Sequence, residues 1–157
     1  MPQINSESFS LKPIAFLRTP FKQKFAIPRQ AGLVDIEGVI EFAVGFQAQE
    51  AIDGLEQVSH LWLHFIFHEN NHDFSHTQVR PPRLGGNKRL GVLATRASFR
   101  PNGLGLSLVK IKAIERTDKH IRIIVLGVDM LDNTPIVDIK PYLPYADSFA
   151  EVQTGWV

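Results

Sequence analysis

The basic side chains of this sequence are concentrated in a stretch that contains no acid, because no Asp or Glu occurs between residues 74 and 114. Its cations are Arg80, Arg83, Lys88, Arg89, Arg96, Arg100, Lys110 and Lys112. Guanidinium groups bind phosphates and carboxylates through paired hydrogen bonds. A basic segment without neutralising acids is typical of a surface that binds an external anion. We therefore expect an anionic ligand here, with a merely solvated basic face as the alternative.

Five histidines recur every four residues, a spacing that on a helix would place them on one face, ready to bind a metal ion. They are His60, His64, His68, His72 and His76. The first three lie where apolar residues alternate with other residues, which predicts a strand. Four residues of strand span about 13 Å, too far for neighbouring histidines to share one ion. We therefore expect no metal site, and His68 is either a pocket residue at the strand end or a structural one.

Two further segments carry residue types suited to ligand binding or proton transfer. Residues 96–105 combine Arg, Ser and Asn with a turn at Asn102-Gly103, which could cradle a charged ligand. This segment has neither the pattern of a Walker loop nor that of the dinucleotide fingerprint. Asp138 and Lys140 alternate along a predicted strand and therefore share a face. They form either a structural ion pair or a base held by a lysine.

The elements that must position these residues are mostly strands. Alternating apolar residues predict strands over 12–18, 36–42, 57–68, 90–95, 107–115, 120–128 and 135–140, with Gly38 as a possible bulge. Apolar residues recur at helical spacing over 47–55, which predicts one short helix. This pattern predicts a mainly β protein, either a small barrel or a curled sheet.

Composition bounds the remaining possibilities. The chain has 157 residues, 44% of them hydrophobic, so we expect one domain over 1–157 with its core over 12–147 and an irregular tail. Zero cysteines exclude a disulfide framework, a zinc ribbon and a thiol nucleophile. No apolar run reaches the roughly 18 residues of a membrane span, and the first ten residues are polar. We therefore expect a soluble cytoplasmic protein without a signal peptide.

Six blocks of sequence occur in a recognisable order along nearly the whole chain. They are Phe25-Ala-Ile-Pro-Arg-Gln30, Ser59-His-Leu-Trp62 with Phe67-His68, Val79-Arg-Pro-Pro-Arg-Leu-Gly-Gly86, Ala94-Thr-Arg96, Phe99-Arg-Pro-Asn102 and Val137-Asp-Ile-Lys-Pro-Tyr142. In this order the blocks resemble the TsaA-like (TrmO) family of S-adenosylmethionine-dependent tRNA adenine-N6 methyltransferases. The resemblance implies a single-sheeted β-barrel with one or two short helices, and a homodimer. The substrate it implies is N6-threonylcarbamoyladenosine beside the anticodon of tRNA, which gains a methyl group on N6.

The resemblance also assigns site residues, motif by motif. For the cofactor S-adenosyl-L-methionine it implies Pro28, Arg29, Gln30, His68, Glu69, Arg96, Leu106, Leu126, Gly127, Val128 and Asp129. RNA phosphates are expected at Arg80, Arg83, Lys88, Arg89 and Arg100. Removal of the N6 proton calls for a general base, for which we expect Asp138, with Asp129 and His68 as alternatives.

The sequence departs from the family pattern at Ala97, Gly103 and Asn133, where a small polar residue, a proline and a glycine are usual. Each replacement keeps a turn feasible. Many bacterial members continue into a C-terminal domain that this sequence does not include. Two other functions stay open: an RNA-binding β-barrel that uses the same basic stretch without a cofactor, and a metal-dependent hydrolase built on the histidines.

Overall fold

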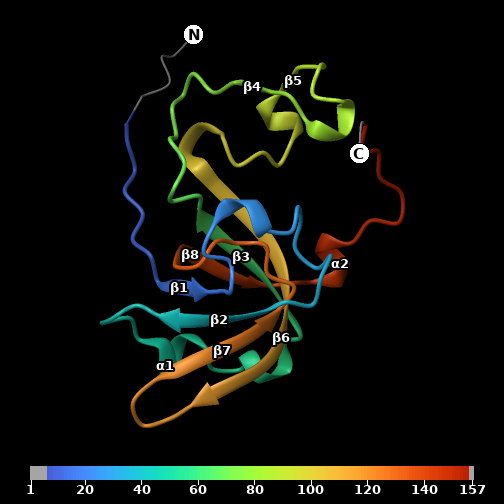
Figure 1. The fold of residues 1–157 in the computed structure, drawn as a ribbon. Helices are drawn as coiled ribbons and strands as arrows, with labels where there is room; N and C mark the ends of the chain where they lie inside the picture. Colours follow the sequence, from blue (N-terminus) through green and yellow to red (C-terminus); the bar gives the residue numbers. More distant parts are fainter. Residues whose placement is uncertain (1–6, 156–157) are drawn as a thin grey trace.

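Six strands close into one antiparallel barrel in the computed structural model, which describes residues 7–155 (Figure 1). Around the barrel the order is β1-β2-β7-β6-β3-β8. The expected mainly β, single-sheeted barrel is therefore confirmed. The barrel strands are β1 (Ala15–Arg18), β2 (Glu37–Phe42), β3 (His60–Ile66), β6 (Leu104–Arg116), β7 (Ile121–Leu126) and β8 (Thr134–Pro141).

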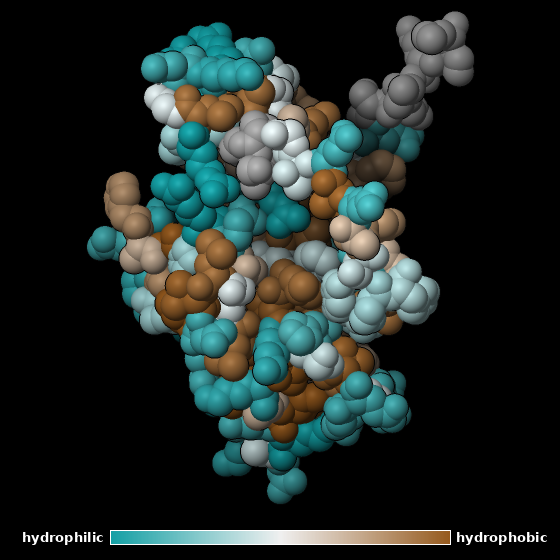
Figure 2. Space-filling model, turned by 90° about the vertical axis from the view of Figure 1, so that its right-hand side faces the viewer, coloured by the Kyte–Doolittle hydropathy of each residue, from teal (hydrophilic) through white to brown (hydrophobic). Residues whose placement is uncertain are grey.

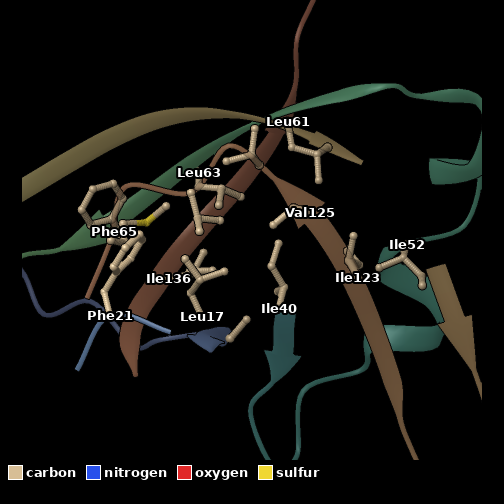
Figure 3. Packing of buried hydrophobic residues seen from close by; sticks show 14 residues of the cluster. Leu17, Phe21, Ile40, Ile52, Leu61, Leu63, Phe65, Ile123, Val125 and Ile136 are labelled. Atoms are coloured by element: carbon tan, nitrogen blue, oxygen red, sulfur yellow. The ribbon is translucent and has the colours of Figure 1, made fainter. Parts of the chain in front are cut away.

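The inside of the barrel is a continuous hydrophobic core, to which every strand contributes (Figure 3). In β3 the period of two buries Leu61, Leu63 and Phe65, while the residues between them are only half-buried. Burying one such side chain stabilises the fold by roughly 1.5–3 kcal/mol. The core makes the barrel a firm support for side chains at its rim. The other strands bury Ala15, Leu17, Ile40, Val109, Ile123, Val125 and Ile136.

Between β3 and β6 the chain leaves the barrel and forms a lobe over residues 68–103, at the upper end of Figure 1. The lobe contains a two-stranded sheet of β4 (Gln78–Val79) and β5 (Leu90–Gly91). Three 3₁₀ turns complete it, at Pro82–Leu84, Val92–Ala94 and Pro101–Gly103. Most of its backbone is irregular, so its shape depends on turns rather than on a ladder of strands.

The helices are short. The α-helix α1 (Ala48–Ala51) and a 3₁₀ turn at Leu55–Gln57 occupy the segment expected to be one helix over 47–55. A second helix, α2 (Pro144–Asp147), begins the tail that was expected to have no element, and a further 3₁₀ turn lies at Lys24–Ala26. No helix within residues 7–155 is long and apolar enough to cross a bilayer. Residues 1–6, part of the polar start of the chain, lie outside the described residues.

Three predicted strands have different boundaries in the structure. The strand expected over 90–95 stops at Gly91, because the chain turns into a 3₁₀ helix, and it belongs to the lobe. The strand expected over 57–68 is shorter, so His68 follows β3 instead of ending it. Strand β6 begins before residue 107, because residues 104–106 already pair with β3.

Gly38 is not a bulge. It pairs in regular register with Val125 of β7. A Cβ atom added to Gly38 would lie 2.7 Å from Cγ1 of Val128, closer than packed carbon atoms approach. Glycine is therefore needed here for close packing against the end of the segment that follows β7.

Candidate ligand-binding pocket

A pocket of about 720 Å³ lies where the lobe joins the barrel. Its walls come from the segment after β1, the two ends of the lobe, the start of β6 and the segment between β7 and β8. The volume is within the range of about 300–1,000 Å³ that is usual for small-molecule and cofactor sites. Figure 2 shows hydrophilic side chains at the upper end of the molecule and exposed hydrophobic ones farther down. The pocket therefore combines polar and apolar walls from segments far apart in the sequence.

Two glycines hold one wall of the pocket together. The backbone N–H of Gly32 donates to the carbonyl of Gly127 at 2.9 Å. Gly127 has a φ of 87°, and a Cβ atom there would lie 3.1 Å from the backbone of Gly32. Only glycine fits this conformation and this close approach. The contact brings residues 28–31 beside Asp129.

The opposite wall reaches the same place through Arg96, at the end of the lobe. Its Nη1 donates to Oε1 of Gln30 at 3.0 Å, so the lobe is tied to the segment after β1. The charge of Arg96 also acts on the Asp129 carboxyl and lowers its pKa. The structure thus brings together three residues, Gln30, Arg96 and Asp129, that the resemblance had placed in one cofactor site.

Asp129 is the acid of this pocket, and it is held by Ser107 of β6. The Ser107 hydroxyl donates to Oδ1 of Asp129 at 2.6 Å. Burial raises the pKa of Asp129 above its ordinary value, although the hydrogen bond from Ser107, backbone N–H groups at residues 129 and 31, and the charge of Arg96 oppose the rise. A partly desolvated carboxyl in a pocket is a candidate for ligand binding or proton transfer.

The mouth of the pocket is fixed by Lys24, a residue that the sequence analysis did not single out. Its Nζ donates to the carbonyl of Glu69 at 2.7 Å and to Oδ1 of Asn70 at 2.9 Å. These bonds attach the beginning of the lobe to the 3₁₀ turn that starts at Lys24. The side chain that follows, Phe25, is 99% exposed. The only sequence signal was a lysine beside a motif of the resemblance, which does not reveal its partner.

Most residues that the resemblance assigns to the cofactor lie in the pocket wall, and three do not. Leu126 ends β7, Gly127 makes the loop contact just described, and Val128 is fully buried. These three support the wall from behind. The pocket-lining ones are Pro28, Arg29, Gln30, His68, Glu69, Arg96, Leu106 and Asp129.

The residues expected to contact RNA fall into two groups. Arg80, Arg83, Lys88 and Arg89 are exposed on the lobe and do not line the pocket. Arg100 is only half-exposed and lines the pocket, with its Nη1 donating to the carbonyl of Thr95 at 2.9 Å. Arg100 therefore shapes the turn that carries Arg96.

Asp138 lies outside the pocket, on the outer face of β8, where it forms an ion pair with Lys140. Partial burial works to raise the pKa of Asp138. Hydrogen bonds from Lys140 and the backbone N–H of Ile139, with the charges of Lys140 and His64, nevertheless lower it overall. In register, His64 of β3 pairs with Asp138 on one side and with the pocket-lining Leu106 on the other. The expected base is therefore one strand removed from the pocket wall.

The five regularly spaced histidines are divided between the barrel and the lobe. His60 and His64 lie on β3, whereas His68 follows it and the other two lie within the lobe. The Nε2 atom of His72 lies 2.6 Å from the carbonyl oxygen of Phe67. Its ring fills the space where a Cβ of Gly103 would stand, which is why a residue without a side chain is required there. Within residues 7–155, no three His, Cys, Asp or Glu side chains are arranged to hold a metal ion.

Comparison with known proteins gives one consistent result. The family model described as the tRNA-methyltransferase O N-terminal domain matches residues 16–148. A protein of Escherichia coli K12 named tRNA (adenine(37)-N6)-methyltransferase is 43% identical over 150 residues, which are 95% of this chain and 64% of that protein. A Pseudomonas aeruginosa protein, whose name contains the words S-adenosylmethionine-dependent methyltransferase, is 50% identical over 147 residues, covering 93% of this chain and 62% of that protein.

The fold gives the same answer. The crystal structure of TrmO from Pseudomonas aeruginosa superposes with a TM-score of 0.78 at 42% sequence identity, over 96% of this chain and 63% of that one. The chain thus spans less than two thirds of the length of these relatives. It belongs to the tRNA-methyltransferase O N-terminal domain family.

Proposed function

We propose that the chain is an S-adenosylmethionine-dependent methyltransferase that acts on N6 of an adenine in tRNA. One observation carries the proposal: Gln30, Arg96 and Asp129, from three distant segments, meet in one pocket of suitable size. The names of the relatives support the same activity. The finer proposal is that the adenine is N6-threonylcarbamoyladenosine beside the anticodon.

The residues of the pocket fit the proposed cofactor. S-adenosylmethionine carries a carboxylate tail, a sulfonium that supplies the methyl group, and an adenosine. Arg29 and Arg96 line the pocket and offer guanidinium groups that suit a carboxylate. Asp129 offers an acceptor for the ribose hydroxyls. The apolar wall at Leu106 suits the adenine ring.

The chemical step needs an acceptor for the N6 proton, because the lone pair of that nitrogen is delocalised into the purine ring and, in the proposed substrate, into the carbamoyl group. We propose Asp138 for this role. Its place on the outer face of β8 means that the target base must lie over β3 and β8, beside His64 and Leu106. If the base instead enters the pocket itself, Asp129 is the nearer carboxylate.

The exposed cations of the lobe are the proposed contacts for RNA phosphates. Arg80, Arg83, Lys88 and Arg89 are exposed on one excursion of the chain whose end, Arg96, reaches the pocket. Phosphate contacts would hold the tRNA while the modified base reaches the methyl donor. Without cofactor binding, the same surface would make the chain an RNA-binding module, which is the second candidate.

We also propose that two copies pair and that the protein works in the cytoplasm as a single domain. Leu104 and Leu106, on the outer face of β6 beside the pocket, are each 45% exposed, and an apolar face of this kind suits a second copy. Sedimentation tests the pairing, and Leu104→Glu should give a monomer.

The activity is tested by mass spectrometry of nucleosides from tRNA incubated with the protein and S-adenosylmethionine. A gain of one methyl group on N6-threonylcarbamoyladenosine supports the proposal in full. A methyl group on unmodified adenine supports only the coarser activity. Binding of tRNA with neither methylation nor cofactor binding would establish the second candidate in its place.

A further inference from the structure

We propose that Ser107 is a positioning residue that aims the Asp129 carboxylate at the ribose hydroxyls of a bound S-adenosyl ligand. The inference rests on the proposed cofactor site. It concerns a residue that lies in β6, outside every sequence block of the resemblance. Its strongest support is the contact between the Ser107 hydroxyl and Oδ1 of Asp129 at 2.6 Å.

The surroundings of Ser107 favour a specific role over a packing role. Its side chain is 3% exposed and points inward, in the row of β6 that also contains Gly105 and Val109. Its register partner on β3 is the fully buried Leu63. A hydroxyl buried among apolar groups costs stability unless it has a hydrogen-bond partner. The partner here is an acid in the pocket wall, so the hydroxyl serves that acid.

The Asp129 carboxylate is held from several directions. Ser107 approaches it from the barrel, and backbone N–H groups at residues 129 and 31 approach it as well. On the far side, Arg96 is kept in place by its bond to Gln30. A carboxylate has about four acceptor positions, so these contacts fix its orientation and leave capacity for a diol. Two neighbouring hydroxyl groups on a ribose match that capacity.

Ser107 also favours the charged form of Asp129, which is the form that can only accept hydrogen bonds. Burial raises the pKa of Asp129, and the Ser107 hydroxyl opposes that rise. Loss of the hydroxyl should therefore raise this pKa further. The other titratable groups that line the same pocket are Lys24, Arg29, His68, Glu69, Arg96 and Arg100.

The test measures binding of S-adenosylhomocysteine and of its 2′,3′-dideoxy analogue by calorimetry, at neutral pH, to wild type and to Ser107→Ala. A hydrogen bond to a charged group contributes enough that its loss should weaken binding of S-adenosylhomocysteine on the order of tenfold or more. The analogue has no ribose hydroxyls, so its affinity should be the same for both proteins. Equal weakening of both ligands would overturn the assignment to the ribose, and no weakening of either would overturn the role of Ser107.

A matched pair of variants separates the hydroxyl from the shape of the side chain. Ser107→Thr keeps the hydroxyl and Ser107→Val has nearly the same volume without it. The threonine variant should retain most of the affinity and the valine variant should lose it. If both lose affinity equally while thermal unfolding shows both folded, packing and not hydrogen bonding is responsible, and the proposal is wrong.

The pH dependence gives a readout that a purely structural role would not move. Binding should be lost as the pH falls and Asp129 takes up a proton, and the midpoint of this loss should move to higher pH in Ser107→Ala. An imidazole can change charge in a similar pH range, so the profile is repeated with His68→Asn. An unmoved midpoint contradicts the inference. If the wild type binds no S-adenosylhomocysteine at any pH, the proposed function fails and the inference falls with it.

Discussion

The barrel and the lobe of residues 68–103 are built on different principles. The barrel buries its apolar side chains in one shared core and pairs its strands in continuous register. In the lobe, two strands of two residues each pair with one another, and the buried Val92 does not belong to the barrel core. Regions with few buried apolar contacts open at lower free energy than a packed core. The lobe should therefore be the more easily opened part of the molecule.

The two regions also carry opposite charges to the pocket. Asp129 and Ser107 belong to the barrel side, whereas Arg96 and the exposed arginines belong to the lobe. A rigid wall suits an acid whose orientation matters, and an irregular, basic excursion suits a long polyanion that must be contacted at several points. The comparison predicts that changes in the barrel affect chemistry and stability, and that changes in the lobe affect binding.

The largest effect is expected for Asp138→Asn, which keeps the shape of the side chain and removes its basicity. If Asp138 accepts the N6 proton, single-turnover methylation should slow by about 10²–10⁴-fold, with binding of tRNA and cofactor unchanged. Glu37→Gln is a matched control, because Glu37 is also ion-paired to a lysine and is also 46% exposed. A normal rate in Asp138→Asn would make Asp138 structural and direct attention to Asp129.

The next effect concerns stability. Leu63→Ala removes a fully buried barrel side chain and should lower the free energy of unfolding by about 2–5 kcal/mol. Leu93→Ala makes the same chemical change in the lobe, where the side chain is 85% exposed, and should cost no more than about 0.5 kcal/mol. Denaturant unfolding of both variants tests the contrast. Equal losses would show that the lobe is as tightly packed as the barrel.

A smaller effect is expected where the two regions meet. Arg96→Ala removes a charge that can bind the cofactor carboxylate, and should weaken binding of S-adenosylmethionine roughly ten- to a hundredfold. Calorimetry on the folded variant measures this. Arg89→Ala, an exposed arginine of the lobe that does not line the pocket, should bind the cofactor normally. Unchanged affinity in Arg96→Ala would remove Arg96 from the cofactor site.

The lobe alone should change the salt dependence of tRNA binding. Affinity should fall linearly on a log–log plot against salt concentration, and Arg83→Ala or Lys88→Ala should each lower the slope by about one unit or slightly less. Lys119→Ala serves as a control, because this exposed lysine lies in the turn between β6 and β7. If the lobe variants leave the slope unchanged and the control lowers it, the RNA lies against the barrel.

The smallest expected effect is none. The histidines are divided between the barrel and the lobe, so we expect methylation to survive a strong chelator. The assay compares rates before and after treatment with the chelator and after dialysis. Loss of activity that zinc or another metal restores would contradict both the strand argument and the proposed chemistry, and would favour the hydrolase alternative.

Much of the barrel was predictable because its strands satisfy a local rule. The period of two in β3 identifies Leu61, Leu63 and Phe65 as core residues, and the structure confirms them. The lobe was less predictable. The apolar residues near Leu93 suggested a strand, but the side chain of Leu93 is exposed and the backbone turns there. A short apolar run without a sheet to join has no reason to stay extended.

The candidate site was predictable only in part. The resemblance supplied Gln30, Arg96 and Asp129, but no local pattern reveals that Ser107 donates to Asp129 from another strand. The contact joins residues 22 positions apart in the chain and depends on the barrel register. Lys24 was missed for the same reason, since its partners lie 45 and 46 residues farther along the chain.

The sequence by itself determined the mainly β character, the core alternation, the acid-free basic stretch and the order of the family motifs, because each of these is a property of neighbouring residues. The tertiary structure decided which of these residues meet. It placed Arg96 beside Gln30 and Ser107 beside Asp129, and it left Asp138 on the outer face of β8. These pairings depend on how the barrel closes and where the lobe returns to it, and burial, hydrogen bonding and pKa all follow from contacts that are distant in the chain.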